Sequence, residues 1–157
     1  MNEMKDILTG TKTALQSAAS LSYINDTDIY ITIDEDLIPN DVTFPAIAIK
    51  DGTINYLVQD ASGNWDPDAY VDVIIYQEIK DGDKSIMSDT GFPRIYGLIE
   101  IAKDVHAVLF DNKLSIADVE SVVPVGERGT EVVYTKDLAL IKKVITYRYG
   151  LYTSPTE

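Results

Sequence analysis

The sequence contains no cysteine, a single histidine, and half as many basic as acidic side chains, with 13 Lys and Arg against 26 Asp and Glu. Without cysteine there is neither a disulfide framework nor a thiolate metal site, so stability must come from packing or from assembly. No apolar run is long enough to span a membrane, and the charged first residues do not form a signal peptide, so we expect neither a membrane span nor export. The formal net charge of −13 disfavours a conventional nucleic-acid binder, because phosphate affinity depends on clustered Lys and Arg.

The acidic charge is unevenly distributed along the chain. Residues 1–127 hold 8 basic and 23 acidic side chains, whereas residues 128–157 hold 5 basic and 3 acidic ones. A chain with one acidic and one mildly basic region can pair with copies of itself, although an acidic surface that only promotes solubility explains the charge equally well. The length of 157 residues fits one domain, residues 1–157, and we expect a flexible tail over residues 153–157.

Two amphipathic helices are the clearest local features of the sequence. The first is predicted from Asn2 to about Ser20. The second is predicted over about residues 94–110, with Pro93 suited to its first turn. From Gly97 to Phe110 its apolar side chains recur at i, i+3, i+4 and i+7, which places them on one face. Both helices are therefore expected to pack on a sheet.

Alternating or β-branched segments predict the strands of that sheet. Residues 44–50 and 53–59 flank the pair Asp51-Gly52, which favours a tight hairpin turn. Residues 70–78 form the longest apolar strand and are expected at the centre of the sheet. Further strands are predicted over residues 28–34, 121–125, 131–135 and 142–149, with a weak one over 84–88, and Pro124 confines its strand to an edge. The predicted fold class is α+β, with a mainly antiparallel sheet and the N-terminal and 94–110 helices packed on it.

Residues that could carry out chemistry are few. The single His106 lies on a predicted helix flank without a nucleophile beside it. The segment Asp60 to Asp68 resembles the opening of a calcium loop, but Trp65 stands where such a loop needs glycine. The acidic stretch Asp34-Glu35-Asp36 is better explained as a solvated loop than as a cation site. We therefore predict no catalytic residue, no metal and no cofactor, and a protein that is not an enzyme.

Large amphipathic and charged side chains are the remaining candidates for a functional surface. An exposed Trp in a polar loop is often an interface anchor, although Trp65 could equally fold back as a lid and the C-terminal tyrosines could pack on the sheet. The predicted oligomer or partner interface comprises Trp65, Asp34, Glu35, Asp36, Arg128, Lys142, Arg148, Tyr147 and Tyr149.

The order of these segments resembles the tail terminator, or tail completion, proteins of long-tailed bacteriophages. The resemblance covers residues 2 to about 150 and rests on Phe44-Pro45-Ala46 opening a hairpin, on Val71 to Glu78 ahead of an amphipathic helix, and on the final strand from Lys143 to Tyr149. The long Asp60 to Asp68 loop and the acidic region 26–41 depart from the commoner forms, so another ring protein of the head-tail neck remains an alternative.

The resemblance implies a structural virion protein that is assembled in the host cytoplasm and resides in the tail or neck. Such a protein forms a homo-oligomeric ring, typically hexameric, at the head-proximal end of the tail. Its partners would be copies of itself, the tail tube protein, which it stops from growing, and the head connector or stopper protein. Genomic DNA would pass through the acidic lumen without specific binding. A separate alternative is an acidic inhibitor or DNA-mimicking module that binds a basic partner.

Overall fold

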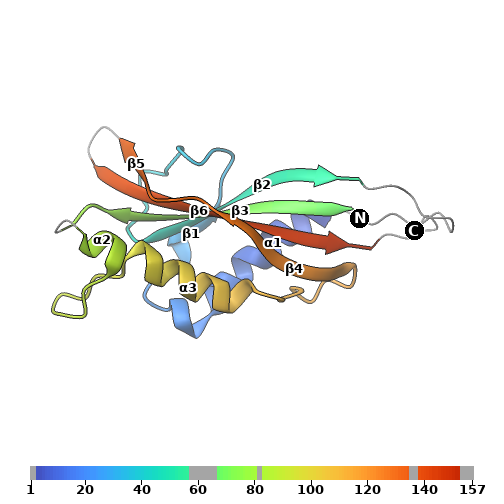
Figure 1. Cartoon of the computed structure of the whole chain (residues 1–157), viewed down its shortest axis with the longest axis horizontal. Coiled ribbons are helices and arrows are strands. Elements are labelled where there is room, and N and C mark those ends of the chain that lie inside the picture. The colour runs from blue at the N-terminus through green and yellow to red at the C-terminus, as the bar shows by residue number, and fades with distance from the viewer. Residues whose placement is uncertain (1–2, 57–66, 81–82, 135–137, 153–157) are drawn as a thin grey trace.

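A computed structural model describes residues 3–56, 67–80, 83–134 and 138–152. The chain forms one six-stranded sheet with helices on one of its faces (Figure 1). The elements in chain order are α1 (Glu3–Ser17), two short 3-10 turns (Ala19–Leu21 and Asp26–Asp28), β1 (Ile29–Ile31), β2 (Ala46–Asn55), β3 (Asp68–Glu78), α2 (Lys84–Met87), α3 (Leu98–Leu109), β4 (Val119–Glu127), β5 (Glu131–Tyr134) and β6 (Ala139–Leu151). The predicted α+β fold class is confirmed.

The sheet is mixed but mainly antiparallel. Its strand order is β1-β2-β3-β6-β4, with β5 also paired to β6. Only β1 and β2 run parallel, and every other pair is antiparallel. Strands β4 and β5 lie end to end along the same edge of β6, because β4 pairs with Ile145–Leu151 and β5 with Ala139–Lys142. The long strand β3 lies at the centre, as the sequence predicts.

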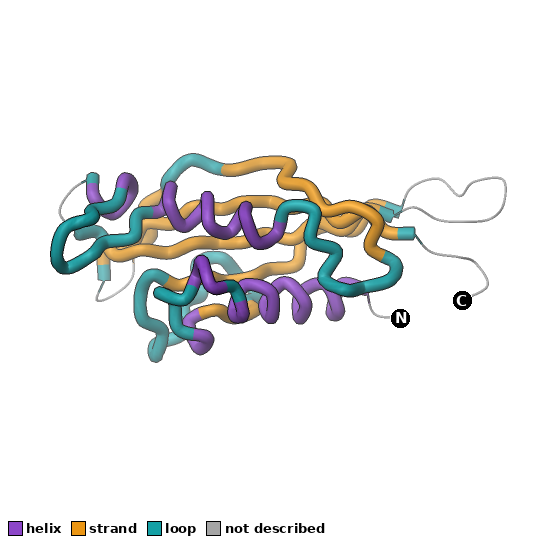
Figure 2. The backbone as a smooth tube through the Cα atoms, turned by 90° about the horizontal axis from the view of Figure 1, so that it is seen from below, coloured by secondary structure: helices purple, strands orange, loops and turns teal. Residues whose placement is uncertain are grey.

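Helices α1 and α3 lie side by side on one face of the sheet (Figure 2). The apolar stripe of α3 is buried as its periodicity predicts, with Leu98, Ile101, Val105 and Leu109 at 0% exposure. These side chains join alternate residues of β2, β3 and β6 in the main core. In the described part of the chain, no helix combines the length and the apolar character needed to cross a membrane.

The opposite face of the sheet is partly covered by residues 32–45, which we name the crossing loop. The loop leaves β1, runs over the sheet and returns to the start of β2 (Figure 1). Its side chains Ile38, Val42 and Phe44 pack on a second, smaller core that includes Ile74 and Tyr76 of β3. Both faces of the sheet near the first half of β2 are therefore buried, which explains the unbroken apolar run from Ala46 to Ile49.

Three local predictions are wrong, and the first concerns Asp51-Gly52. Asp51-Gly52 does not turn the chain: β2 continues through it with a register shift, so the pair forms a β-bulge. A Cβ at Gly52 would lie 2.8 Å from the Tyr70 carbonyl oxygen, so glycine allows the neighbouring strand to approach closely. Residues 57–59, the end of the expected second hairpin strand, lie outside the described residues.

The other two corrections concern the segment between β3 and α3. Residues 84–88 are not a strand, because Lys84–Met87 forms the short helix α2. The helix predicted from about residue 94 begins at Leu98, so Pro93 is not in its first turn. Residues 89–95 instead form a loop closed by an isolated antiparallel bridge, in which Asp89 and Ile95 exchange two backbone hydrogen bonds of 2.9 and 3.0 Å.

A buried hydrogen bond joins α1 to the sheet and yields a stability prediction. The Thr11 and Tyr149 hydroxyls lie 2.9 Å apart, and both side chains are 0% exposed. Burial raises the pKa of Tyr149 to about 12, so its hydroxyl is protonated at neutral pH. We expect Tyr149→Phe to lower the free energy of unfolding by about 1–3 kcal/mol, because it leaves the Thr11 hydroxyl buried and unpaired.

Urea titrations of a double-mutant cycle measure this effect. Thr11→Val combined with Tyr149→Phe removes both polar groups, so the pair should cost less than the sum of the single changes. Additive losses would mean that the two hydroxyls do not interact.

Candidate interaction surface

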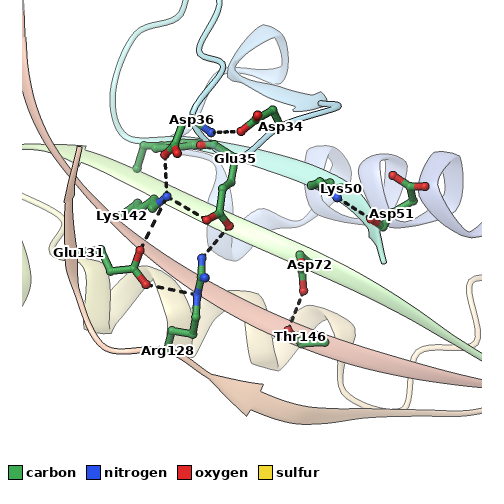
Figure 3. Close-up of polar contacts among 11 residues, drawn as sticks. Asp34, Glu35, Asp36, Lys50, Asp51, Asp72, Arg128, Glu131, Lys142 and Thr146 are labelled. Atoms are coloured by element: carbon green, nitrogen blue, oxygen red, sulfur yellow. Dashed lines mark hydrogen bonds and ion pairs between the residues drawn. The ribbon is translucent and has the colours of Figure 1, made fainter. Parts of the chain in front are cut away.

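Four of the nine residues predicted for the interface meet in one group of side chains. Glu35 and Asp36 come from the crossing loop, Arg128 from the junction between β4 and β5, and Lys142 from β6 (Figure 3). Glu131 of β5, which the sequence analysis did not single out, completes the group. We name Glu35, Asp36, Arg128, Glu131 and Lys142 the charge cluster.

Lys142 is the centre of the charge cluster. Its Nζ donates to Asp36 Oδ1 at 2.7 Å and to Glu35 Oε1 at 3.2 Å, and Glu131 Oε2 lies 3.8 Å away. The Lys142 side chain is only 5% exposed. Burial alone would lower the pKa of Lys142, but its hydrogen bonds and charge attraction to Asp36 and Glu35 outweigh burial and raise that pKa above its usual value. Lys142 is therefore a buried cation held by three carboxylates.

Arg128 contacts two of these three carboxylates, those of Glu35 and Glu131. Its guanidinium contacts Glu35 Oε2 at 2.6 Å and Glu131 Oε1 at 3.3 Å. The Tyr76 hydroxyl also donates to the Glu35 carbonyl from beneath the crossing loop. The charge cluster thus joins the crossing loop to the β4–β5–β6 side of the sheet, so its charges pair with one another within a single chain.

Asp34 lies beside the charge cluster but has a different role. Its Oδ1 accepts the Asp36 backbone N–H at 2.8 Å, and its carbonyl accepts the Thr32 hydroxyl at 2.9 Å. These bonds close a local turn, as Asp side chains commonly do. Asp34 therefore stabilises the turn of the crossing loop, whereas Glu35 and Asp36 form the ion pairs.

The two predicted interface tyrosines lie in the core, which corrects their assignment to a surface. Tyr147 and Tyr149 are both 0% exposed and face the helices. The Tyr147 hydroxyl lies 2.8 Å from His106 Nδ1, so the single histidine contacts a core tyrosine. The alternation of β6 predicts that Tyr147 and Tyr149 share one face of the sheet. It does not predict that helices cover this face, so the burial of the two tyrosines could not be read from the sequence.

The other two predicted residues are placed differently. Arg148 is half-buried and, by strand alternation, lies on the face of β6 opposite to Tyr147 and Tyr149, outside the charge cluster. Trp65 and the candidate calcium ligands at 60–66 lie outside the described residues. Among the residues that are described, no group of three or more His, Asp or Glu could hold a metal ion.

Large apolar side chains are exposed along both free edges of the sheet, and the sequence analysis did not identify them as a surface. At the β1 edge, Ile31 is 43%, Ile33 81% and Leu37 55% exposed. At the opposite edge, Val125 is 47%, Val132 50% and Tyr134 87% exposed. In the sequence, these residues could be recognised only as apolar residues in edge strands. The sequence does not show which strands lie at the edges, because that depends on the strand order of the sheet.

Comparisons with known proteins bear on the fold. No protein-family model matches the sequence, and no curated protein matches it. The structure is similar to a chain in the solved structure described as "Virion of native gene transfer agent (GTA) particle", with a TM-score of 0.55 and 10% sequence identity. The similarity covers 94% of this chain and 95% of that chain. The overall fold of this chain is therefore similar to that of a chain in a virion particle.

Proposed function

We propose that this protein is a structural component of a phage-like virion, and specifically a tail terminator that forms a ring at the head-proximal end of the tail. The observation that carries the proposal is the fold similarity to a chain of a gene transfer agent virion, which extends over 94% of this chain and 95% of the other. The sequence resemblance to tail terminators, found independently in the order of the segments, supports the same assignment.

The surface of the subunit is consistent with assembly. The two free edges of the sheet carry exposed apolar side chains, and such edges tend to pair with another chain. The net charge of −13 is suited to a lumen through which DNA passes without binding. In this proposal the protein acts without catalysis, and its partners are its own copies, the last ring of the tail tube and the head connector.

Assembly of the purified protein tests the proposal. Multi-angle light scattering and negative-stain microscopy, alone and with the tail-tube protein of the same genome, should reveal rings of about six copies of the 17.4 kDa chain. Adding the protein to growing tubes should shorten them, because a terminator caps the growing end. A protein that remains monomeric under both conditions and leaves tube length unchanged would refute the proposal.

A neck ring other than the terminator, or an acidic inhibitor, would give different results in the same experiment. A neck ring would assemble without shortening the tubes. An inhibitor of a basic protein would stay monomeric and form a one-to-one complex with that partner.

A further inference from the structure

The edge of β1 is open and apolar. Among the described strands, β1 pairs only with β2, so the backbone groups on its other side have no strand partner. Ile31, Ile33 and Leu37 line a groove of about 350 Å³ along this edge, together with Tyr30, Ile38 and Pro39. Strand β1 itself, Ile29–Ile31, contains no lysine and no proline, which are residues that commonly protect an edge strand from pairing. The edge of β1 is therefore open to pairing with a further strand.

The opposite edge of the sheet, formed by β4 and β5, has a matching character. Within the described chain, both strands pair only with β6. Val125, Val132 and Tyr134 are exposed along this edge. Strand β5 has four residues and β1 has three, so the two are similar in length.

Strand direction decides how these two edges can meet. Strand β1 runs parallel to β2, and three successive antiparallel pairs lead from β2 through β3 and β6 to β4 and β5. Strands β4 and β5 therefore run opposite to β1. Two copies set side by side in the same orientation would bring these edges together as an antiparallel pair, with the helices of both copies on the same side.

Net charge disfavours contact between two β1 edges. Residues 26–41 around the β1 edge contain six acidic and no basic side chains. Residues 119–134, which span β4 and β5, contain three acidic side chains and one basic side chain. A β1 edge is therefore repelled less by a β4–β5 edge than by a second β1 edge.

We propose that a second copy of this chain docks its β4–β5 edge onto the β1 groove, so that copies join head to tail through one continuous sheet. This inference rests on the proposed ring and names the surfaces that close it. Because the contact is heterologous, each copy offers one edge of each kind, and repetition of the contact yields the proposed ring when its rotation is a whole fraction of a turn about one axis.

Two complementary variants test this interface. Ile33→Lys with Leu37→Lys disrupts the β1 groove, and Val125→Glu with Tyr134→Glu disrupts the β4–β5 edge. All four side chains are at least 47% exposed, so both proteins should fold with wild-type circular dichroism. Met87→Lys with Ile99→Lys is the matched control, because these residues are 65% and 51% exposed on α2 and α3, away from both edges. If a double variant unfolds, Ile33→Lys or Tyr134→Glu alone replaces it.

Sedimentation equilibrium over a concentration series gives the readout, with tail-tube protein added where wild-type assembly requires it. Each edge variant alone should be a monomer. An equimolar mixture of the two should form a dimer but no larger species, because the intact β4–β5 edge of one variant can bind only the intact β1 groove of the other. The control should assemble as the wild type does.

Edge variants that still form rings, a variant that dimerises with itself, or a control that fails to assemble would overturn the interface and leave the proposed ring standing. A wild-type protein that never assembles would overturn both.

Discussion

Replacement of Gly97 by alanine is expected to lower the free energy of unfolding by about 3 kcal/mol. Gly97 is the residue before the first turn of α3, and it lies directly against the end of α2. A Cβ at this position would lie 2.5 Å from both the Ile86 carbonyl oxygen and the Ser88 backbone nitrogen. Neither group is the end of a flexible side chain, so α2 and α3 would have to move apart, which disturbs the buried first turn of α3.

Urea unfolding followed by circular dichroism measures this loss. Gly126→Ala is the matched control, because a Cβ there would meet nothing within 4 Å. We expect it to leave the free energy of unfolding within about 0.5 kcal/mol of the wild-type value. Equal losses at Gly97 and Gly126 would contradict the steric argument, because only Gly97 has backbone atoms within contact distance of the added Cβ.

Replacement of Lys142 by methionine should cost about 2–3 kcal/mol of folding free energy. Removing one partner of a buried ion pair typically costs about 3–5 kcal/mol, because the opposite charge stays behind without compensation. The loss here should be smaller, since Glu35, Glu131 and Asp36 are 27%, 42% and 66% exposed and can be partly solvated. Methionine keeps an unbranched apolar stem of similar length, so the change isolates the charge.

Lys143→Met provides the control for this second prediction. Lys143 is the neighbouring residue, is 15% exposed and has one carboxylate, Glu127, at 3.8 Å. We expect a loss of less than about 1 kcal/mol for this weaker pair. Faster proteolysis within the crossing loop of Lys142→Met, but not of Lys143→Met, would show that the charge cluster fastens this loop. Similar protection in both variants would contradict that role.

The contribution of Lys142 should also depend on pH with a defined sign. Its pKa is raised in the folded state, so its stabilisation is fully present below the unfolded-state value of 10.5 and is lost as pH rises through the folded-state value. The difference in unfolding free energy between the wild type and Lys142→Met should therefore hold from neutral pH to about pH 10 and shrink above it. Urea titrations at pH 7, 9 and 11 would test this trend.

Local patterns predicted most of the secondary structure. The 3.6-residue period of the Leu98–Leu109 segment and the length and apolar character of Asp68–Glu78 are properties of neighbouring residues, and both elements form where the patterns indicate. The same reasoning failed at Asp51-Gly52, since the pair suits a turn and a bulge equally well. The close approach of Tyr70, a residue distant in sequence, decided between them.

The candidate surface could be predicted only in part. The charges of Glu35 and Lys142 were recognised, but their 3.2 Å contact joins residues 107 positions apart, and no local pattern carries that information. The burial of Tyr147 and Tyr149 likewise depends on helices that pack from the other end of the chain.

The amino-acid sequence alone established the acidic character of the protein, its two amphipathic helices and most of its strands, because composition and periodicity are local quantities. The tertiary structure decided which strands lie at the edges, which charged side chains pair within the chain, and which aromatic side chains are buried. The physical reason is that burial and ion pairing depend on distances across the fold. Those distances follow from the order in which β1, β2, β3, β6 and β4 are laid side by side.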